Sequence, residues 1–304
     1  MARQAIISQI TRCSLHDGPG IRTVVYLKGC NLRCLWCHNP ENQSALVELL
    51  DQPSRCIRCG RCLTVCSAGS RVFVDGQNAW DRERCRQCLQ CAAVCPNEAI
   101  VVCGQAMTEQ TVYNEILKDR DYYAATGGGV TFSGGECLLQ PDFVRATASL
   151  CQAKSIHTAV ESAFSVPWSS VECVLAVIDL FLIDIKHPDN AVHKQLTGKG
   201  NRQILDNISR LSRCHPAVNI RVPLIPTAND SRDSLHGLAD IINTCGRGIQ
   251  TVELLRYNNL AEGKYRALGR PFHGFADHPQ VDAALEASAA ILRSRLRDDV
   301  RVLY

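Results

Sequence analysis

The sequence has no long uninterrupted apolar run. Its longest apolar stretch, near residues 173–185, is cut by Asp179 and Asp184, whereas a helix that spans a membrane needs roughly 20 consecutive apolar residues. The first residues of the chain also lack a hydrophobic core of the length that a signal peptide requires. These absences predict a cytoplasmic protein that has no membrane partner.

The sequence also has little excess of charge of either sign. Its 33 Lys and Arg residues face 30 Asp and Glu residues, which gives a formal net charge of +3, and no basic block stands out. Chains that bind nucleic acid or anionic membranes usually carry such blocks. We therefore expect no nucleic-acid partner.

Cysteine, in contrast, is abundant, with 18 in a chain of 304 residues. Disulfides are rare in a reducing cytosol, so metal binding is the natural use of so many thiols. Three cysteines lie within residues 30–37 and eight within residues 56–95. The other seven are interpreted as small buried hydrophobic residues: Cys13, Cys103, Cys137, Cys151, Cys173, Cys214 and Cys245.

Cys30, Cys34 and Cys37 form a CxxxCxxC motif directly after the strand-like run Thr23–Leu27. A 4Fe-4S cluster normally takes four cysteine ligands. Three cysteines with no fourth nearby therefore predict a cluster with one iron left open for another ligand. The alternatives are a zinc site or buried structural cysteines, and the spacing favours the cluster.

Residues 45–103 carry an internal repeat with the spacing C-x2-C-x2-C-x3-C. This is the pattern of two-cluster bacterial ferredoxins, in which the fourth cysteine of each run binds the cluster of the other run. A pair of structural zinc sites is the alternative, and Ser67 replaces the proline that usually follows the first run. The two predicted ligand sets are Cys56, Cys59, Cys62 and Cys95, and Cys85, Cys88, Cys91 and Cys66.

After Cys103 the sequence alternates between short apolar runs and helical segments. A helix capped by Thr108 is expected to reach about Arg120, with a break over residues 121–129. A last helix is expected over 281–297. Strands apolar on both faces predict a parallel sheet that curls toward a barrel. The expected strands are 5–10, 23–27, 130–132, 157–161, 180–186, 218–222, 251–257 and 300–304.

Polar residues stand where several of these strands end. The carboxyl ends of parallel strands share one edge, and ligands collect there in α/β proteins. We therefore expect one site that also includes the Cys30 loop, with acids suited to an ammonium group and bases suited to a carboxylate, as an amino acid offers. The residues are Ser133 to Glu136, Glu161, Asp184 with Lys186, Arg221, and Tyr257 with Asn258.

These features together resemble the radical S-adenosylmethionine (SAM) enzymes that activate glycyl radical enzymes. The matching segments are 16–22, 30–39, 133–136, 184–186 and 220–221, and the cluster-rich insert is similar to that of the longer subclass. The resemblance implies an α/β fold: a partial (β/α)6 TIM-like barrel over 1–44 and 104–304, with a ferredoxin-like insert over 45–103. It implies three 4Fe-4S clusters in all.

The resemblance also implies the chemistry. SAM would bind the open iron and, after one-electron reduction, give a 5′-deoxyadenosyl radical that takes a hydrogen atom from a backbone glycine of a partner glycyl radical enzyme. A reduced flavodoxin or ferredoxin is the expected electron donor. The two insert clusters are expected to relay electrons to the Cys30 cluster, with docking or structural support as the alternative.

Site roles follow from the same resemblance. The residues implied as catalytic are Cys30, Cys34, Cys37 and Lys186. Trp36 and His38 would line the nucleoside. Gly134, Gly135 and Glu136 would hold the methionine ammonium and Arg221 its carboxylate. Residues Asp184, Ile185 and Lys186 would bind the ribose and carboxylate region.

Three positions depart from the family pattern. Glu161 stands where short activators carry an Asp associated with a monovalent cation, so the resemblance leaves open whether a cation binds near Glu161. Asn258 replaces a histidine that lies near the adenine, which weakens the expected stacking. Cys137 replaces a proline after Gly-Gly-Glu and is interpreted as packing. Two other functions remain: a radical SAM enzyme that acts on a small molecule, and a multi-cluster electron-transfer protein.

Overall fold

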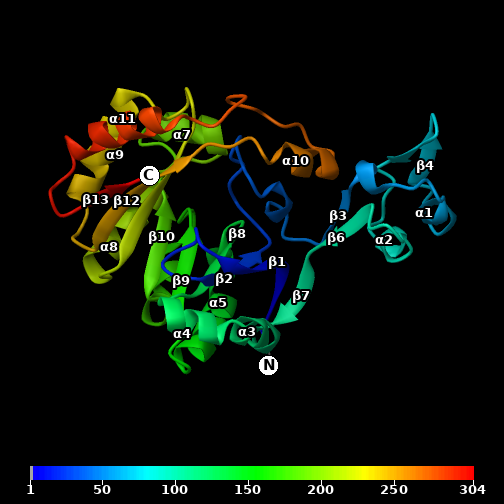
Figure 1. The fold of residues 1–304 in the computed structure, drawn as a ribbon, viewed down its shortest axis with the longest axis horizontal. Helices are drawn as coiled ribbons and strands as arrows, with labels where there is room; N and C mark the ends of the chain where they lie inside the picture. The colour runs from blue at the N-terminus through cyan, green and yellow to red at the C-terminus, as the bar shows by residue number, and fades with distance from the viewer. Residues whose placement is uncertain (1–2) are drawn as a thin grey trace.

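A computed structural model describes residues 3–304 and is organised by a nine-stranded sheet (Figure 1). Met1 and Ala2, which belong to the expected segment 1–44, lie outside the described residues. The strand order is β13-β12-β11-β10-β9-β8-β2-β1-β7. Seven neighbouring strands run parallel: β2 (Arg22–Leu27), β8 (Gly129–Gly134), β9 (His157–Ser162), β10 (Leu180–Asp184), β11 (Val218–Leu224), β12 (Ile249–Arg256) and β13 (Arg301–Leu303).

The middle of the sheet is buried on both faces, as the sequence predicted. Every residue of β8 except its last is buried, and β10 is buried up to Asp184. Phe132, Val160 and Phe181 are fully enclosed in the main core. Such strands need cover on both sides, which is typical of parallel sheets in α/β proteins. The predicted α/β class with a mostly parallel sheet is confirmed.

Two antiparallel strands extend this sheet beyond β2. β1 (Gln4–Ser14) pairs with β2, and β7 (Gln105–Thr108) pairs with β1. The sequence predicted only residues 5–10 of β1. The strand runs on to Ser14 because it follows β2 through irregularities in the register after Ile7 and Thr11.

Helices connect most of the parallel strands, and the short η segments are 3-10 turns. Figure 1 shows α3, α4 and α5 grouped together, with α8, α9 and α11 beside the β11 to β13 end. No helix within residues 3–304 combines the length and apolar character needed to cross a membrane. The helices are α3 (Glu109–Leu117), α4 (Arg120–Thr126), α5 (Pro141–Gln152), α6 (Trp168–Glu172), α7 (Asn190–Thr197), α8 (Arg202–Cys214), α9 (Arg232–Thr244), α10 (Glu262–Leu268) and α11 (Asp282–Arg293); the turns are η1 (Pro40–Asn42), η2 (Pro53–Arg55), η3 (Cys137–Leu139) and η4 (Leu175–Val177).

The predicted helix after Thr108 is right at its start and wrong at its end. Thr108 caps α3, its side chain accepting a hydrogen bond from the Thr111 backbone N–H at 3.1 Å. The chain breaks at Lys118 and Asp119, and α4 then covers residues expected to be a break. Asp119 is held there by tertiary contacts: its carboxylate accepts from Arg12 Nε at 2.9 Å and from Thr23 Oγ1 at 2.6 Å.

Residues 48–103 form a separate lobe with two small sheets, seen at the right of Figure 1. β3 pairs with β6, and β4 pairs with β5, both antiparallel. Short helices carry some of the cysteines. The elements are β3 (Glu48–Asp51), α1 (Arg61–Thr64), β4 (Arg71–Val74), β5 (Gln77–Trp80), α2 (Gln90–Ala93) and β6 (Ile100–Cys103).

Two ion pairs and a hydrogen bond fix this lobe against the rest of the molecule. Glu48 of β3 accepts from Lys28 Nζ at 3.1 Å and from Arg270 Nη2 at 2.7 Å. Arg82 donates from Nη2 to the Ala267 carbonyl of α10 at 2.9 Å. Lys28 directly follows β2 and precedes the Cys30 loop, so the lobe is anchored beside that loop.

We expect Asp119→Asn to lower the free energy of unfolding by about 2 kcal/mol, because it weakens the hydrogen bonds to a charged, buried acceptor. Arg12 lowers the pKa of Asp119, so this stabilisation is present above the unfolded-state pKa and is lost as the pH falls through the folded-state pKa. Urea denaturation measures the change, with Asp121→Asn on the exposed surface of α4 as control. Equal stability of the two variants would contradict the assignment.

Candidate active site

A cavity of about 340 Å³ lies at the carboxyl ends of the parallel strands. The Cys30 loop forms one wall, and the ends of β8 to β12 form the others. Most of the predicted site residues are brought together here. Those that line the cavity are Cys30, Cys34, Trp36, Cys37, His38, Ser133, Gly134, Gly135, Glu161, Asp184, Lys186, Tyr257 and Asn258, whereas Glu136, Ile185 and Arg221 do not.

The Cys30 loop is held by backbone hydrogen bonds on two sides. The Gly29 N–H donates to the Asn42 carbonyl at 2.9 Å, and the Arg33 N–H donates to the Thr197 carbonyl at 2.7 Å. Burial raises the pKa of Cys30 to about 11 and that of Cys34 to about 12, while the nearby Lys186 charge opposes the rise. Positive charge close by therefore favours the thiolate form, which is the form that binds metal.

Gly134 and Gly135 allow the β8 backbone to approach this loop closely. The Gly135 N–H donates to the Leu27 carbonyl at 3.0 Å, and the Glu136 N–H donates to the Gly29 carbonyl at 2.8 Å. Gly134 has a φ of +121°, and a Cβ atom on Gly135 would lie 2.3 Å from the Gly29 carbonyl oxygen. Only glycine fits this approach.

The carboxylate of Glu136 is occupied by partners from its own surroundings. It accepts hydrogen bonds from Ser162 Oγ at 2.6 Å, from the Ala163 N–H at 3.1 Å and from the Leu138 N–H at 3.2 Å. Glu136 is buried, and burial raises its pKa. The side chain thus ties the β8 turn to the end of β9 and does not reach the cavity.

Asp184 and Lys186 form an ion pair in the cavity wall, with 2.7 Å between Lys186 Nζ and Asp184 Oδ2. Burial lowers the pKa of Lys186, but the charge of Asp184 and the nearby thiols raise it more, so the ammonium stays protonated. Asp184 Oδ1 is buried with no hydrogen-bond partner among residues 3–304. An unsatisfied buried oxygen that lines a cavity is suited to accept a hydrogen bond from a ligand.

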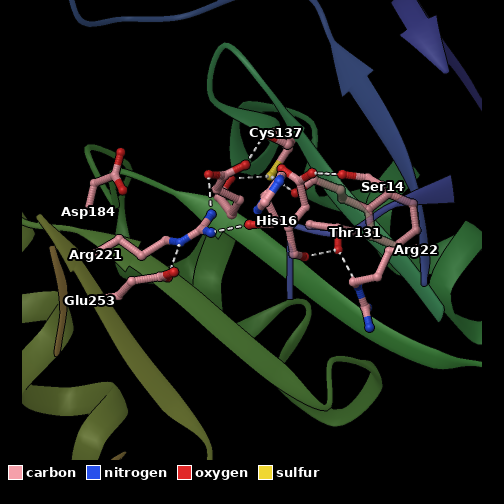
Figure 2. Close-up of polar contacts among 12 residues, drawn as sticks. Ser14, His16, Arg22, Thr131, Cys137, Asp184, Arg221 and Glu253 are labelled. Atoms are coloured by element: carbon pink, nitrogen blue, oxygen red, sulfur yellow. Dashed lines mark hydrogen bonds and ion pairs between the residues drawn. The ribbon is translucent and has the colours of Figure 1, made fainter. Parts of the chain in front are cut away.

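Arg221 lies beside the cavity, and each nitrogen of its guanidinium donates a hydrogen bond within the protein (Figure 2). Its Nη1 donates to Glu161 at 2.7 Å and its Nε to Glu253 at 2.9 Å, while Nη2 donates to the His16 carbonyl. Glu161 also accepts from Ser133 Oγ at 2.6 Å. Arg221 therefore fixes the position of Glu161 and of the His16 loop. Nothing in the sequence marked Glu253, which lies in the middle of β12.

The opposite end of the cavity is aromatic. His38 Nε2 and the Asn258 carbonyl oxygen are 2.9 Å apart. Trp36 packs edge to face against Phe275, with 5.8 Å between the ring centroids. Burial lowers the pKa of His38, which favours a neutral ring there. Phe275 lies in an irregular stretch without a motif, so no sequence pattern pointed to it.

The eight cysteines of the lobe surround two further cavities. One is lined by Cys56, Cys59, Cys62 and Cys95, and the other by Cys66, Cys85, Cys88 and Cys91. These groups match the two crossed sets predicted from the repeat. Among residues 3–304 no three Cys, His, Asp or Glu side chains gather closely enough for a single metal ion. Four cysteines at each cavity are the number of ligands that a 4Fe-4S cluster takes.

Three families match parts of this chain. Residues 83–238 match the Radical SAM superfamily, residues 48–96 match a 4Fe-4S dicluster domain, and residues 16–54 match a 4Fe-4S single cluster domain. A radical SAM methyltransferase from Sphaerobacter thermophilus has a similar fold, with a TM-score of 0.52 and 13% identity over 97% of this chain and 77% of that chain.

Curated relatives match over most of the length. The (2S)-3-sulfopropanediol dehydratase activating enzyme of Klebsiella oxytoca is 40% identical, covering 88% of this chain and 86% of that protein. The benzylsuccinate synthase activating enzyme of Thauera aromatica is 41% identical, covering 87% and 82%. The choline trimethylamine-lyase activating enzyme of Oleidesulfovibrio alaskensis is 36% identical, covering 96% of each chain.

We expect Gly135→Ala to remove roughly four iron atoms per chain, those of one 4Fe-4S cluster. The added methyl group would collide with the Gly29 and Asn42 carbonyl oxygens and displace the Cys30 loop. Iron analysis after anaerobic reconstitution measures the loss. Gly263→Ala, where a Cβ meets nothing within 4 Å, is the matched control. Full iron content in Gly135→Ala would contradict this account of the glycine pair.

Proposed function

The chain belongs to the radical SAM enzymes that activate glycyl radical enzymes, and from this premise we propose that the 340 Å³ cavity is where it binds and cleaves SAM. One observation carries the proposal: the three motif cysteines and the Asp184–Lys186 pair line the same cavity. The protein is an oxidoreductase that generates a radical for a partner glycyl radical enzyme. It uses iron-sulfur clusters and SAM.

Cys30, Cys34 and Cys37 would hold a 4Fe-4S cluster that leaves one iron open. SAM bound there would supply, after reduction by one electron, a 5′-deoxyadenosyl radical able to take a hydrogen atom from a backbone glycine of the partner. The protein's own part is to bind, orient and exclude water. Lys186 Nζ offers a positive charge to the carboxylate, and Asp184 Oδ1 offers a free acceptor to the ribose.

Four predicted ligand contacts are reassigned on the basis of side-chain contacts. Arg221 is fully engaged, so we assign it the holding of Glu161 rather than a contact with the methionine carboxylate. Glu136 likewise bonds to Ser162 within the protein, so we assign contact with the methionine ammonium to the Gly134 and Gly135 backbone, which lines the cavity. Ile185 is buried outside the cavity. Because Arg221 supplies positive charge beside Glu161, we assign no monovalent cation to that residue.

Trp36, His38 and Asn258 make up the nucleoside end of the site in this proposal. The Trp36 indole and the neutral His38 ring provide flat apolar surface, and Asn258 adds polar groups in place of an aromatic side chain. A purine ring bound there would stack on one side and donate hydrogen bonds on the other.

The lobe would contribute two further 4Fe-4S clusters, three in all. Support comes from the two four-cysteine cavities and from the match to a dicluster domain. We place the insert at residues 45–103 and the partial (β/α)6 barrel at 1–44 and 104–304. An incomplete barrel leaves an open side for the glycine loop of the partner. The lobe clusters would pass electrons from a reduced flavodoxin or ferredoxin to the Cys30 cluster.

A reducing compartment suits this chemistry, because cluster ligands must be unoxidised thiolates, and none of the 18 cysteines is paired in a disulfide. We therefore propose that the enzyme works in the cytoplasm. The relatives activate partners as different as a dehydratase, a synthase and a lyase, at identities of 36–41%. Overall identity thus does not follow the partner's reaction.

The cavity assignment predicts that Cys34→Ala abolishes formation of 5′-deoxyadenosine by the anaerobically reconstituted, dithionite-reduced enzyme. Cys214→Ala should cleave SAM at the normal rate, because this thiol is exposed and lies outside the cavity. The burial predicted from the sequence for Cys214, and for Cys13, is wrong, since both are exposed. Chromatographic assay of 5′-deoxyadenosine measures both. Cleavage by Cys34→Ala at the normal rate would refute the cavity as the catalytic site. A glycyl radical signal in electron paramagnetic resonance (EPR), on mixing with a glycyl radical enzyme of the same genome, tests the protein substrate against a small molecule.

The relay role predicts that Cys59→Ala or Cys88→Ala slows reduction of the Cys30 cluster by reduced flavodoxin at least tenfold, because each removes a ligand of one relay cluster. Binding of SAM to the Cys30 cluster should not change, since the lobe cavities are separate from the main cavity. Stopped-flow reduction and equilibrium SAM binding measure the two effects. Normal reduction rates would leave the lobe a docking or structural role.

A further inference from the structure

A buried arginine lies in the lobe among the cysteines of both four-cysteine sets. Arg71 opens β4 and pairs with Trp80 across the β4–β5 hairpin. Its side chain is only 1% exposed. Nη1 donates to both carboxylate oxygens of Asp51, each at 2.7 Å. Asp51 therefore accepts hydrogen bonds from one nitrogen of the guanidinium and none from the other two.

Those other nitrogens are unsatisfied. Arg71 Nε and Nη2 are buried and have no hydrogen-bond partner within residues 3–304. Buried guanidinium donors are almost always paired, because leaving them unpaired costs free energy. A sulfur acceptor is therefore expected next to Arg71, supplied by the surrounding cysteines, of which Cys91 is within reach, or by a cluster that they hold.

Trp80 places Arg71 relative to the two sets. The guanidinium carbon lies 4.3 Å from the Trp80 ring centroid. Trp80 in turn packs into the small apolar core that contains Cys62 and Cys95 of one set and Cys85 and Cys91 of the other. The guanidinium therefore lies against the core that contains cysteines of both sets.

We propose that Arg71 is a positioning residue of the electron relay, whose fixed charge and two free donors face the sulfur of both lobe clusters and raise their reduction potentials. The inference rests on the proposed function in so far as the lobe holds two clusters. Each cluster gains one negative charge when it takes up one electron. A buried positive charge beside both stabilises the reduced forms, and Asp51 offsets part of this effect.

The test reads the potentials of the lobe clusters and not catalysis. In full-length chain carrying Cys30→Ala, Cys34→Ala and Cys37→Ala, only the lobe clusters remain to be reduced. They are titrated anaerobically at fixed potentials and the reduced fraction is measured by EPR. We expect Arg71→Gln to lower the ratio of reduced to oxidised cluster about tenfold at a given potential, a shift of 59 mV for a one-electron couple.

Two further variants make the result specific. Asp51→Asn leaves the Arg71 charge without its counterion and should shift the ratio in the opposite direction. Arg84→Gln removes the same charge from a side chain that is 70% exposed, where water and salt screen it, and should leave the ratio unchanged. Arg71→Lys keeps the charge and should stay closer to the parent protein than Arg71→Gln does.

The outcomes separate this inference from the proposed function. A parent protein that binds no iron in the lobe would overturn the two-cluster proposal itself. Loaded clusters whose potentials are indifferent to Arg71→Gln and Asp51→Asn would overturn only the role of Arg71. Where Arg71→Gln fails to load its clusters, Asp51→Asn decides: an unchanged ratio refutes the inference, and an easier reduction supports it.

Discussion

The active site depends on the close approach of two backbones, the β8 turn and the loop that follows β2. Two hydrogen bonds, from the Gly135 and Glu136 N–H groups to the Leu27 and Gly29 carbonyls, join them. Because the carbonyl oxygens occupy the space of a side chain, residues 134 and 135 must be glycine. The cysteine loop is thereby hydrogen-bonded to the end of β8, a buried inner strand of the sheet.

Charges around the cavity follow a second constraint, since buried charges must be paired. Arg221 lies between Glu161 and Glu253, and Lys186 is paired with Asp184. The first group is complete within the protein and therefore acts as scaffold. The second keeps one carboxylate oxygen free and lies on the cavity wall, so it is the group that can respond to a ligand.

Sequence spacing predicted the sheet, its parallel strands and the residues that reach one edge, because these depend on local periodicity and on motifs. It did not predict which partner each side chain takes. The sequence predicts that Arg221 and Glu136 contact a ligand. In the structure Arg221 donates a hydrogen bond to Glu253, and Glu136 accepts one from Ser162. Those partners lie in other strands and carry no motif. The predicted end of the helix after Thr108 is wrong for the same reason, because Asp119 is held by hydrogen bonds from Arg12 and Thr23, which lie in strands distant in sequence.

The lobe is separate in sequence and in outline, yet Glu48 makes it part of the electrostatic balance of the main body. Its carboxylate is the acidic partner of Lys28, whose side chain is fully buried two residues before Cys30. Excising the lobe would leave an ammonium ion in the interior with no counterion, and such orphaned charges are far more harmful than the loss of a surface contact. The lobe is therefore a structural necessity by charge: a chain without it would have to replace Lys28 as well.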